Sequence, residues 1–252
     1  MRDPAACQSG GVSGLAAQVP PGDARSDNLP VSSRDVGTAV VLRTVLFLTL
    51  LAGAALGGDC RAQGLREQLF EAIDAGNESE VARLVRAGVH YTAKNADGET
   101  PLYFAVEKGQ RGTALLLLDN GADVRARTPN GETALHAAAL HEEPALALLL
   151  LERGAEIGAA NRNGETPIHW AAMTGTLPVV KLLAGSGASL QAGDGAGNTP
   201  LHGAAEGGNA ELVSWLLSQK ARVTARNKAG RRPMDLARAR GHAEVVKLLS
   251  RK

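Results

Sequence analysis

Thr166-Pro167-Ile168-His169 is a tetrapeptide that recurs along this chain with small changes. Its copies start every 33 residues. A fixed period of roughly 20 to 50 residues indicates a repeat architecture whose units bury their cores against one another. The other copies are Thr100-Pro101-Leu102-Tyr103, Thr133-Ala134-Leu135-His136, Thr199-Pro200-Leu201-His202 and a degraded Arg232-Pro233-Met234-Asp235.

Three columns of glycine keep the same register. One precedes the tetrapeptide by two residues, the second is interrupted by Glu142, and the third is interrupted by Lys220. Together with the tetrapeptide, these columns resemble the ankyrin repeat family over roughly residues 64 to 252. The resemblance implies an all-α solenoid of about six units including caps, each with a helix-turn-helix and a hairpin finger per 33 residues. The columns are Gly98, Gly131, Gly164, Gly197 and Gly230; Gly76, Gly109, Gly175, Gly208 and Gly241; and Gly88, Gly121, Gly154 and Gly187.

The residue types predict where the helices of each unit begin and end. The threonine of the tetrapeptide can cap a helix, and proline is tolerated at the first helical position because its missing N–H would be unpaired there. We expect a first helix over 167–174, ended by Gly175, and more aliphatic second helices over 145–151 and 178–184. The segment 123–130 would then project as a finger, with Asn130-Gly131 as its turn.

The fifth unit departs most from the pattern. It carries Gly193, Gly195 and Gly207 beside the expected glycines, and it places Lys220 in a column that otherwise holds glycine. A side chain in the left-handed conformation costs about 1 kcal/mol. We therefore expect this unit to be the least stable.

Composition agrees with a stack of short helices. The chain is 44% hydrophobic but only 3% aromatic, and such a stack can be filled by Ala, Leu and Val. The net charge of +1 gives no electrostatic case for nucleic acid or an anionic membrane. Both cysteines, Cys7 and Cys60, precede the repeats, so the repeats can form neither a disulfide nor a thiolate metal site.

The chain divides into three segments on composition. Residues 1–35 are rich in Gly, Pro, Ser, Asp and Ala and are expected to be a disordered or misassigned extension, with translation starting near Val36 to Val41. Residues 36–62 contain fifteen uncharged residues, 44–58, after Arg43. This length is typical of a signal-peptide core, with cleavage after Ala62. Residues 63–252 form the repeat domain.

Two other interpretations of residues 36–62 stay open. The segment could remain on the chain as an N-terminal membrane anchor, or it could pack as an apolar helix on the repeats. Cleavage predicts a periplasmic or secreted protein, whereas an uncleaved segment predicts a membrane-anchored one. If the segment is cleaved, we expect no contact between the protein and a membrane.

The recurring histidines suggest a metal array at first sight. Adjacent copies should lie about 10 Å apart, whereas zinc ligands converge within about 2 Å of one ion, so they cannot share a metal. The ankyrin resemblance implies that each histidine instead hydrogen-bonds its own threonine and the backbone of the next unit. The structural residues of the tetrapeptides are then Thr133, His136, Thr166, His169, Thr199 and His202.

The sequence offers no catalytic chemistry in the repeats. His141-Glu142-Glu143 resembles part of a zinc-protease helix but lacks the second histidine, and neither a nucleophile elbow nor a phosphate-binding glycine motif is present. We expect a non-enzymatic protein with no cofactor and no metal.

The resemblance also implies a partner protein bound on the concave face, which the finger tips and the exposed side of the first helices form. We expect an acidic row at Glu99, Glu132 and Glu165, an apolar centre at Leu140, Trp170 and Met173, and a basic carboxy-terminal end. Trp170 could equally belong to the core. The full set of predicted contact residues is Glu99, Arg127, Glu132, Leu140, His141, Arg162, Glu165, Trp170, Met173, Arg226, Lys228 and Arg231.

These features predict an exported, monomeric protein–protein interaction module whose partner the sequence does not identify. Two alternatives remain. One is a membrane-tethered envelope scaffold. The other is an accessory protein of an oxidative-stress system of the catalase type, which a resemblance to small exported bacterial ankyrin proteins implies.

Overall fold

A computed structural model describes residues 58–250 of the chain. The predictions for residues 1–35 and for 36–57 therefore lie outside the described residues. Residues 58–250 contain six pairs of helices and no strand. The pairs are α2 (Gly58–Asp74) with α3 (Glu78–Arg86), α4 (Pro101–Glu107) with α5 (Arg111–Asp119), α6 (Ala134–Ala138) with α7 (Ala145–Glu152), α8 (Pro167–Thr174) with α9 (Leu177–Gly185), α10 (Pro200–Gly207) with α11 (Ala210–Ser218), and α12 (Pro233–Ala239) with α13 (Ala243–Ser250).

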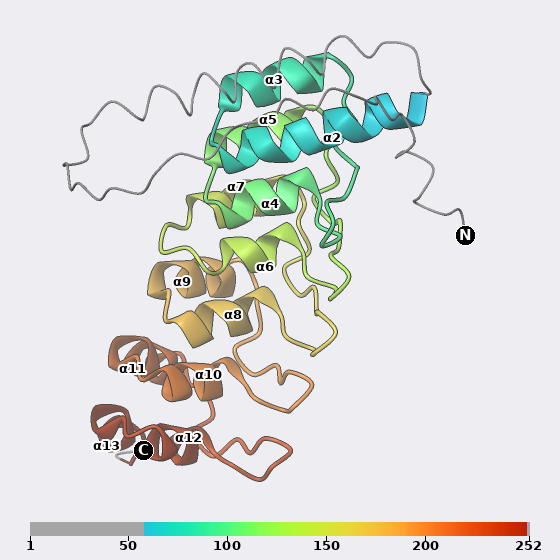
Figure 1. The fold of residues 1–252 in the computed structure, drawn as a ribbon. Coiled ribbons are helices and arrows are strands. Elements are labelled where there is room, and N and C mark those ends of the chain that lie inside the picture. Colours follow the sequence, from blue (N-terminus) through green and yellow to red (C-terminus); the bar gives the residue numbers. More distant parts are fainter. Residues whose placement is uncertain (1–57, 251–252) are drawn as a thin grey trace, which may run out of the picture. The chain divides into compact units, whose positions relative to one another are not determined.

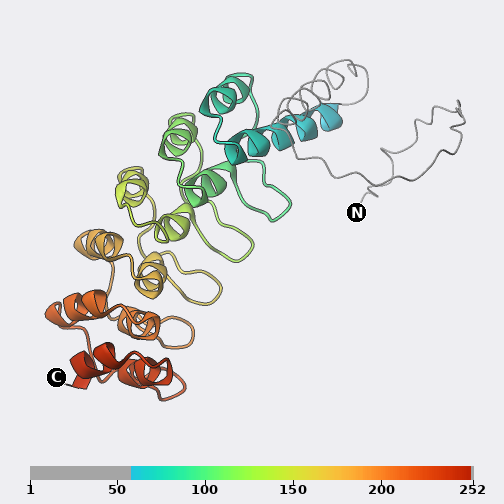
Figure 2. The ribbon, with the colours of Figure 1, turned by 60° about the vertical axis from the view of Figure 1, so that its left-hand side comes forward.

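The helices of the repeat region form two parallel rows. Figure 1 shows α2, α4, α6, α8, α10 and α12 stacked in one row, and their partners stacked behind them in another. A loop leaves each unit beside the first row and projects sideways as a finger. Figure 2 shows that the stack curves toward the fingers, so that the fingers and the first row line its concave face.

Local residue choice explains the helix bounds. α8 begins after Thr166, which is extended, and Pro167 occupies its first turn. Gly175 ends the helix in the left-handed conformation, at φ +84°. These are the bounds predicted from the sequence, and the predicted second helices are each within two residues of the observed ones.

The core is a repeated set of small and aliphatic side chains. Ala105 and its equivalents in the next four units are fully buried in the first row, where alanine lets neighbouring helices approach closely. Leu117 and its equivalents are fully buried in the second row. The two columns are Ala105, Ala138, Ala171, Ala204 and Ala237, and Leu84, Leu117, Leu150, Leu183 and Leu216.

Each finger is closed by a turn rather than by paired strands. In the finger of the third unit, the Gly131 N–H donates to the Thr128 carbonyl at 2.9 Å, and the Thr128 N–H donates to the Glu132 carbonyl at 2.9 Å. Gly131 takes a φ of +83°, whereas Asn130 does not enter the left-handed region. Asn130-Gly131 therefore forms the end of a four-residue turn with glycine in last place, which is the position that such turns favour.

Backbone hydrogen bonds also join successive fingers. The Arg162 N–H donates to the Asn130 carbonyl at 2.8 Å, and the Lys228 N–H donates to the Ala196 carbonyl at 2.8 Å. The Gly195 N–H donates to the Asn163 carbonyl at 2.6 Å, so the fingers of the third to sixth units form a continuous row whose tips are held in register. This row gives the concave face a fixed edge.

The two interruptions in the glycine columns have different outcomes. Lys220 does adopt the left-handed conformation, at φ +60°, and is the only non-glycine residue within 58–250 with a positive φ. Glu142 instead lies in a turn between α6 and α7 that is longer than the equivalent turns of the other units, because α6 ends early, at Ala138.

The predicted boundary between residues 62 and 63 falls inside α2, which begins at Gly58. None of the helices in residues 58–250 has the length and hydropathy needed to cross a membrane.

Candidate interaction surface

In the three tetrapeptides that end in histidine, the threonine and the histidine form a closed hydrogen-bond box. The Thr133 N–H donates to His136 Nδ1 at 3.1 Å, and His136 Nε2 lies 3.1 Å from the Glu165 carbonyl of the next unit. Because a carbonyl can only accept, Nε2 carries the proton and Nδ1 accepts. The ring is fully buried, and this burial lowers the pKa of His136 below its usual value. His136 is thus a neutral link between units.

The same box recurs in the fourth and fifth units. His169 Nε2 lies 3.0 Å from the Ala192 carbonyl, and His202 Nε2 lies 3.1 Å from the Arg231 carbonyl. In the sixth unit Asp235 replaces the histidine and accepts from the Arg232 N–H at 2.9 Å and from the Arg232 guanidinium. The guanidinium holds the pKa of Asp235 down at about 2. The degraded tetrapeptide is therefore closed by an ion pair.

A polar column that the sequence analysis missed closes each finger at its base. The Asn161 Oδ1 accepts from the N–H groups of Asn163 and Glu165 at 2.9 Å each. Thr128 makes the second of these contacts through its hydroxyl. The signal was present, because polar residues able to accept from the backbone recur every 33 residues at Asn95, Thr128, Asn161, Asp194 and Asn227.

The predicted acidic row is tied to these finger bases. The side-chain amides of Asn95 and Asn161 donate to Glu99 Oε2 at 2.7 Å and to Glu165 Oε2 at 2.8 Å. Glu132 Oε2 accepts from the Thr128 hydroxyl at 3.1 Å. All three carboxylates are half-buried and lie at equivalent positions in successive units. They line the concave face while also holding the fingers closed.

Arg127 and Arg226 lie at equivalent positions in their fingers, and each donates a hydrogen bond to the carbonyl of the glycine in its own finger turn. Arg127 Nη1 donates to the Gly131 carbonyl at 2.9 Å and to the Ala160 carbonyl of the next finger at 2.8 Å. Arg226 Nη1 donates to the Gly230 carbonyl at 2.6 Å. Both side chains lie at the finger edge of the concave face, with their guanidinium groups engaged by the protein itself.

The residues of the predicted apolar centre lie just after α6 and within α8. Leu140 and Met173 are 41% and 54% exposed, although most large apolar side chains of this domain are buried. Trp170 lies one turn before Met173 and packs edge-on against His136, with 5.3 Å between ring centroids. Its Nε1 donates to Glu165 Oε2 at 3.2 Å, and the ring is half-buried. We call Leu140, Trp170 and Met173 the apolar row.

The paired helices, the threonine–histidine boxes and the row of fingers agree with a match to a known family. The family described as ankyrin repeats (3 copies) matches overlapping segments over residues 44–128, 69–161, 120–194 and 179–252. The chain belongs to the ankyrin repeat family. Ankyrin repeats are protein–protein interaction modules, so the family predicts a protein partner. A search of curated proteins found no match to this chain.

A second set of side chains joins successive ankyrin units at the turns between helices. Thr176 Oγ1 donates to the Ala139 carbonyl at 3.0 Å, and Gln110 Nε2 donates to the Ile73 carbonyl at 2.5 Å. His141 makes the equivalent contact in the third unit, with Nε2 2.8 Å from the Val106 carbonyl. His141 was predicted as a partner contact. The structure also gives it a half-buried structural contact between units.

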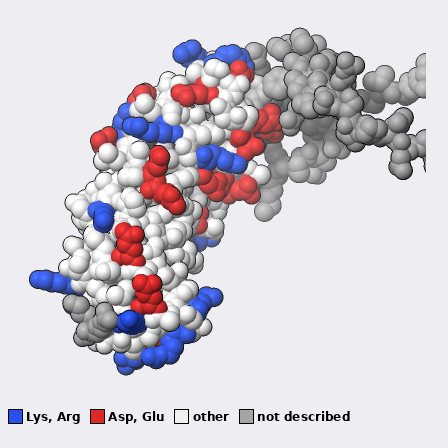
Figure 3. Space-filling view, turned by 90° about the vertical axis from the view of Figure 1, so that its left-hand side faces the viewer, with Lys and Arg blue, Asp and Glu red and all other residues white. Residues whose placement is uncertain are grey.

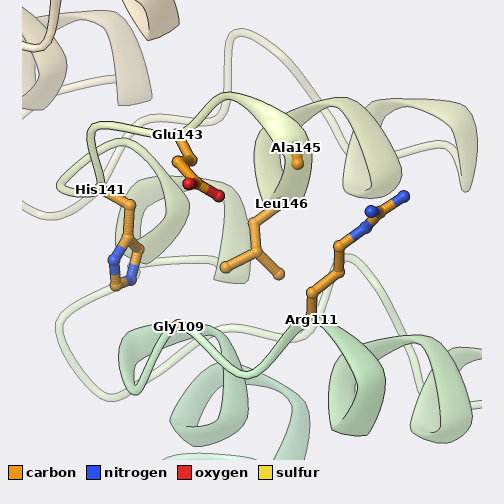
Figure 4. Close-up of a pocket in the computed structure, with 6 residues that line it drawn as sticks. All are labelled: Gly109, Arg111, His141, Glu143, Ala145 and Leu146. Atoms are coloured by element: carbon orange, nitrogen blue, oxygen red, sulfur yellow. The ribbon is translucent and has the colours of Figure 1, made fainter.

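The altered turn of the third ankyrin unit leaves a shallow hollow beside it. Figure 4 shows the hollow between the α4–α5 turn and the α6–α7 turn, with His141 and Arg111 on opposite sides and Glu143 at the rim. The other lining residues are Gly109, Ala145 and Leu146. Within residues 58–250, no three His, Cys, Asp or Glu side chains lie close enough together to hold a metal ion.

The carboxy-terminal end of the ankyrin array is basic. Lys228 and Arg231 are exposed on the last finger, near Arg226. Figure 3 shows Lys and Arg gathered at this end of the molecule. Arg162, in contrast, is an exposed basic residue on the finger of the fourth unit, beside the acidic row. The concave face is therefore graded from an acidic and apolar region to a basic end.

Proposed function

We propose that the protein is a non-catalytic interaction module that binds another protein on its concave face. The observation that carries this proposal is the apolar row. Leu140 and Met173 are exposed on adjacent units at the carboxyl-terminal ends of first-row helices, and a cluster of apolar residues within a charged rim is the usual distribution of binding energy at protein interfaces.

The convex side supplies a matched control for this surface. Leu115 on α5 and Leu148 on α7 are 38% and 45% exposed, and they lie on the second row of helices, away from the fingers. They match Leu140 and Met173 in exposure and in separation along the chain. Substitutions at the two pairs should perturb folding and solubility to a similar extent.

The test is capture of a partner from cells by the full chain and by two double variants. We expect Leu140→Asp with Met173→Asp to lose the partner, because two charges would be buried without partners at the centre of the interface. Leu115→Asp with Leu148→Asp should retain it. Loss of the partner in the second variant alone would move the site to the convex face and contradict the proposal.

We further propose that this binding takes place after export, in the periplasm or outside the cell. The support is the sequence pattern of residues 36–62, with Arg43 followed by fifteen uncharged residues and small residues near Ala62. Mass spectrometry of the mature amino terminus is the test. A chain starting at Gln63 is the expected result, and retention of residues 44–58 would instead favour the membrane-tethered scaffold.

A further inference from the structure

Four carboxylates gather on the concave face next to the apolar row, and none of them forms an ion pair among the side chains described for residues 64–250. Asp97 lies on the finger of the second unit and Glu99 at its base. Glu107 ends α4, and Glu132 lies at the base of the next finger. Lys108 is the adjacent cation along the chain, but its Nζ pairs with Asp74 at 2.7 Å. We call Asp97, Glu99, Glu107 and Glu132 the acidic cluster.

The members of the acidic cluster are close enough to act on one another. Partial burial raises the pKa of Glu107, and the negative charges of Glu99, Glu132 and Asp97 raise it further, against a smaller opposing effect of Lys108. The hydroxyl of Tyr103, on α4, is surrounded by the same charges and donates to Glu132 Oε2 at 3.4 Å. The free protein therefore maintains a concentration of negative charge that Lys108 opposes only in part, since its Nζ is paired with Asp74.

The position of this charge relative to the apolar row is fixed by the repeat. Leu140 is the equivalent of Glu107 one unit further along, so the two side chains are separated by about one helix spacing, roughly 10 Å. Met173 continues the same column into the fourth unit. One elongated strip of the concave face thus runs from acidic to apolar over three units.

We propose that this strip binds a cationic, amphipathic segment of the partner protein, whose apolar residues contact Leu140 and Met173 while its Lys or Arg residues lie over the acidic cluster. This inference rests on the proposed function and specifies the chemistry of the partner. If the segment is helical, a spacing of about 10 Å corresponds to roughly seven residues at 1.5 Å per residue. Its basic residues should then lie about two turns from its apolar anchors.

Other cationic or polar ligands fit this strip less well. The cluster does not gather three ligands at the spacing that a metal ion needs. Nucleic acid would be repelled, because its phosphates carry the same sign of charge. A protein segment with Lys or Arg satisfies the carboxylates and the exposed apolar side chains together.

The test uses two synthetic amphipathic peptides with identical leucine positions, one with lysine and one with glutamate at every polar position. Binding of each labelled peptide to the full chain is measured by fluorescence anisotropy at two salt concentrations. We expect the lysine peptide to bind and the glutamate peptide not to bind, with the affinity falling as salt rises. Equal binding of both peptides, or binding of neither, would overturn the inference.

A matched pair of variants places the binding on the strip. Asp97→Asn with Glu107→Gln removes two exposed charges from the cluster, and we expect it to weaken the lysine peptide by about fivefold or more at low salt. Glu152→Gln with Glu211→Gln removes the same charge from the second row of helices and should leave the affinity unchanged. Equal weakening by both pairs would show only a general charge effect and would overturn the inference.

The outcome is separable from that of the proposed function. A partner whose capture is lost with Leu140→Asp and Met173→Asp but is insensitive to Asp97→Asn, Glu107→Gln and salt would support the concave face and overturn the cationic segment. A partner indifferent to the leucine and methionine changes would overturn the proposed function itself.

Discussion

His136 and His202 make the stability of the array depend on pH. Both rings are fully buried, and burial lowers the pKa of each below the ordinary value of 6.5. Protonation would also remove the lone pair on Nδ1 that accepts from the threonine N–H. The unfolded chain takes up these protons as pH falls through about 6.5, whereas the folded chain does not, so the free energy of unfolding must fall with pH.

We expect urea denaturation to report this loss between pH 7.5 and 5.5, at up to about 1.4 kcal/mol per pH unit for each histidine. His136→Gln removes one titrating group and should reduce the pH dependence of the unfolding free energy, whatever it does to the stability at pH 7.5. An unchanged slope in this variant would show that His136 does not carry the effect.

Lys220 is a second residue whose conformation has a measurable cost. Its φ of +60° places it in the left-handed region, where the four earlier members of its column are glycine. Lys220→Gly should raise the free energy of unfolding by about 1 kcal/mol, because glycine has no Cβ to strain the backbone there. Lys220→Ala removes the same long side chain but keeps the Cβ, and it should give little gain in denaturant titrations.

Individual side-chain contacts were predictable where one residue type recurs at one position. The threonine–histidine box followed from the tetrapeptide and the ankyrin resemblance. The hydrogen bonds of Asp235 and His141 were not predictable. Asp235 replaces the histidine of the box, and His141 replaces the side chains that join the helix turns of other units. Such replacements keep the hydrogen bond but change the residue type, so comparing the residue types of successive repeats does not reveal them.

At the scale of the helices, glycine decides how closely α10 approaches α8. A Cβ built on Gly207 would lie 2.7 Å from the Met173 carbonyl oxygen, which is backbone and cannot move aside. The additional glycine of the fifth unit therefore has a packing role that the sequence did not reveal. It permits close contact between two helices of the first row.

Gly207→Ala should destabilise the protein by about 1 to 3 kcal/mol, because overpacking against backbone outweighs the better helix propensity of alanine. Gly185→Ala is the matched change at the last residue of α9, where a Cβ meets nothing within 4 Å. It should stabilise by about 0.5 to 1 kcal/mol. Thermal denaturation of the two variants decides the matter, and a stabilising Gly207→Ala would refute the packing role.

Helix bounds were more predictable than turns. Thr166, Pro167 and Gly175 fix the ends of α8 locally, and the predicted bounds were confirmed. The early end of α6 was not foreseen, since Glu142 interrupts a glycine column without indicating the new path of the chain. The finger turns also differ from the prediction. A two-residue Asn-Gly hairpin turn has both residues in the left-handed region, whereas only the glycine is left-handed in the fingers.

At the scale of the whole molecule, the repeat period was sufficient to predict a solenoid, because every unit buries its core on its neighbours. The stability of such an array is nearly a sum of units and interfaces. The fifth unit combines a strained Lys220 with additional glycines at 193 and 195, which lose more conformational entropy on folding than other residues do. We expect amide hydrogen exchange to be fastest between Gly193 and Lys220, and uniform protection along the array would contradict this ranking.

The features of the proposed binding surface were only partly predictable at this scale. The period fixes that Leu140 and Met173 occupy equivalent positions in successive units, and both side chains are exposed. The acidic cluster was not predictable, because it depends on which carboxylates form ion pairs within the protein. Glu206, the equivalent of Glu107 and Leu140, is paired with Arg240 at 2.6 Å, and this distinction needs the structure.

The most direct measurement is site-specific photo-crosslinking of the full chain in living cells. A photoreactive amino acid is placed at the position of Met173 on the concave face and, in a second variant, at the position of Leu148 on the convex side, which is similarly exposed. The account predicts one discrete protein crosslinked through position 173 and none through position 148. Crosslinking through position 148 alone, or equally through both, would contradict binding on the concave face.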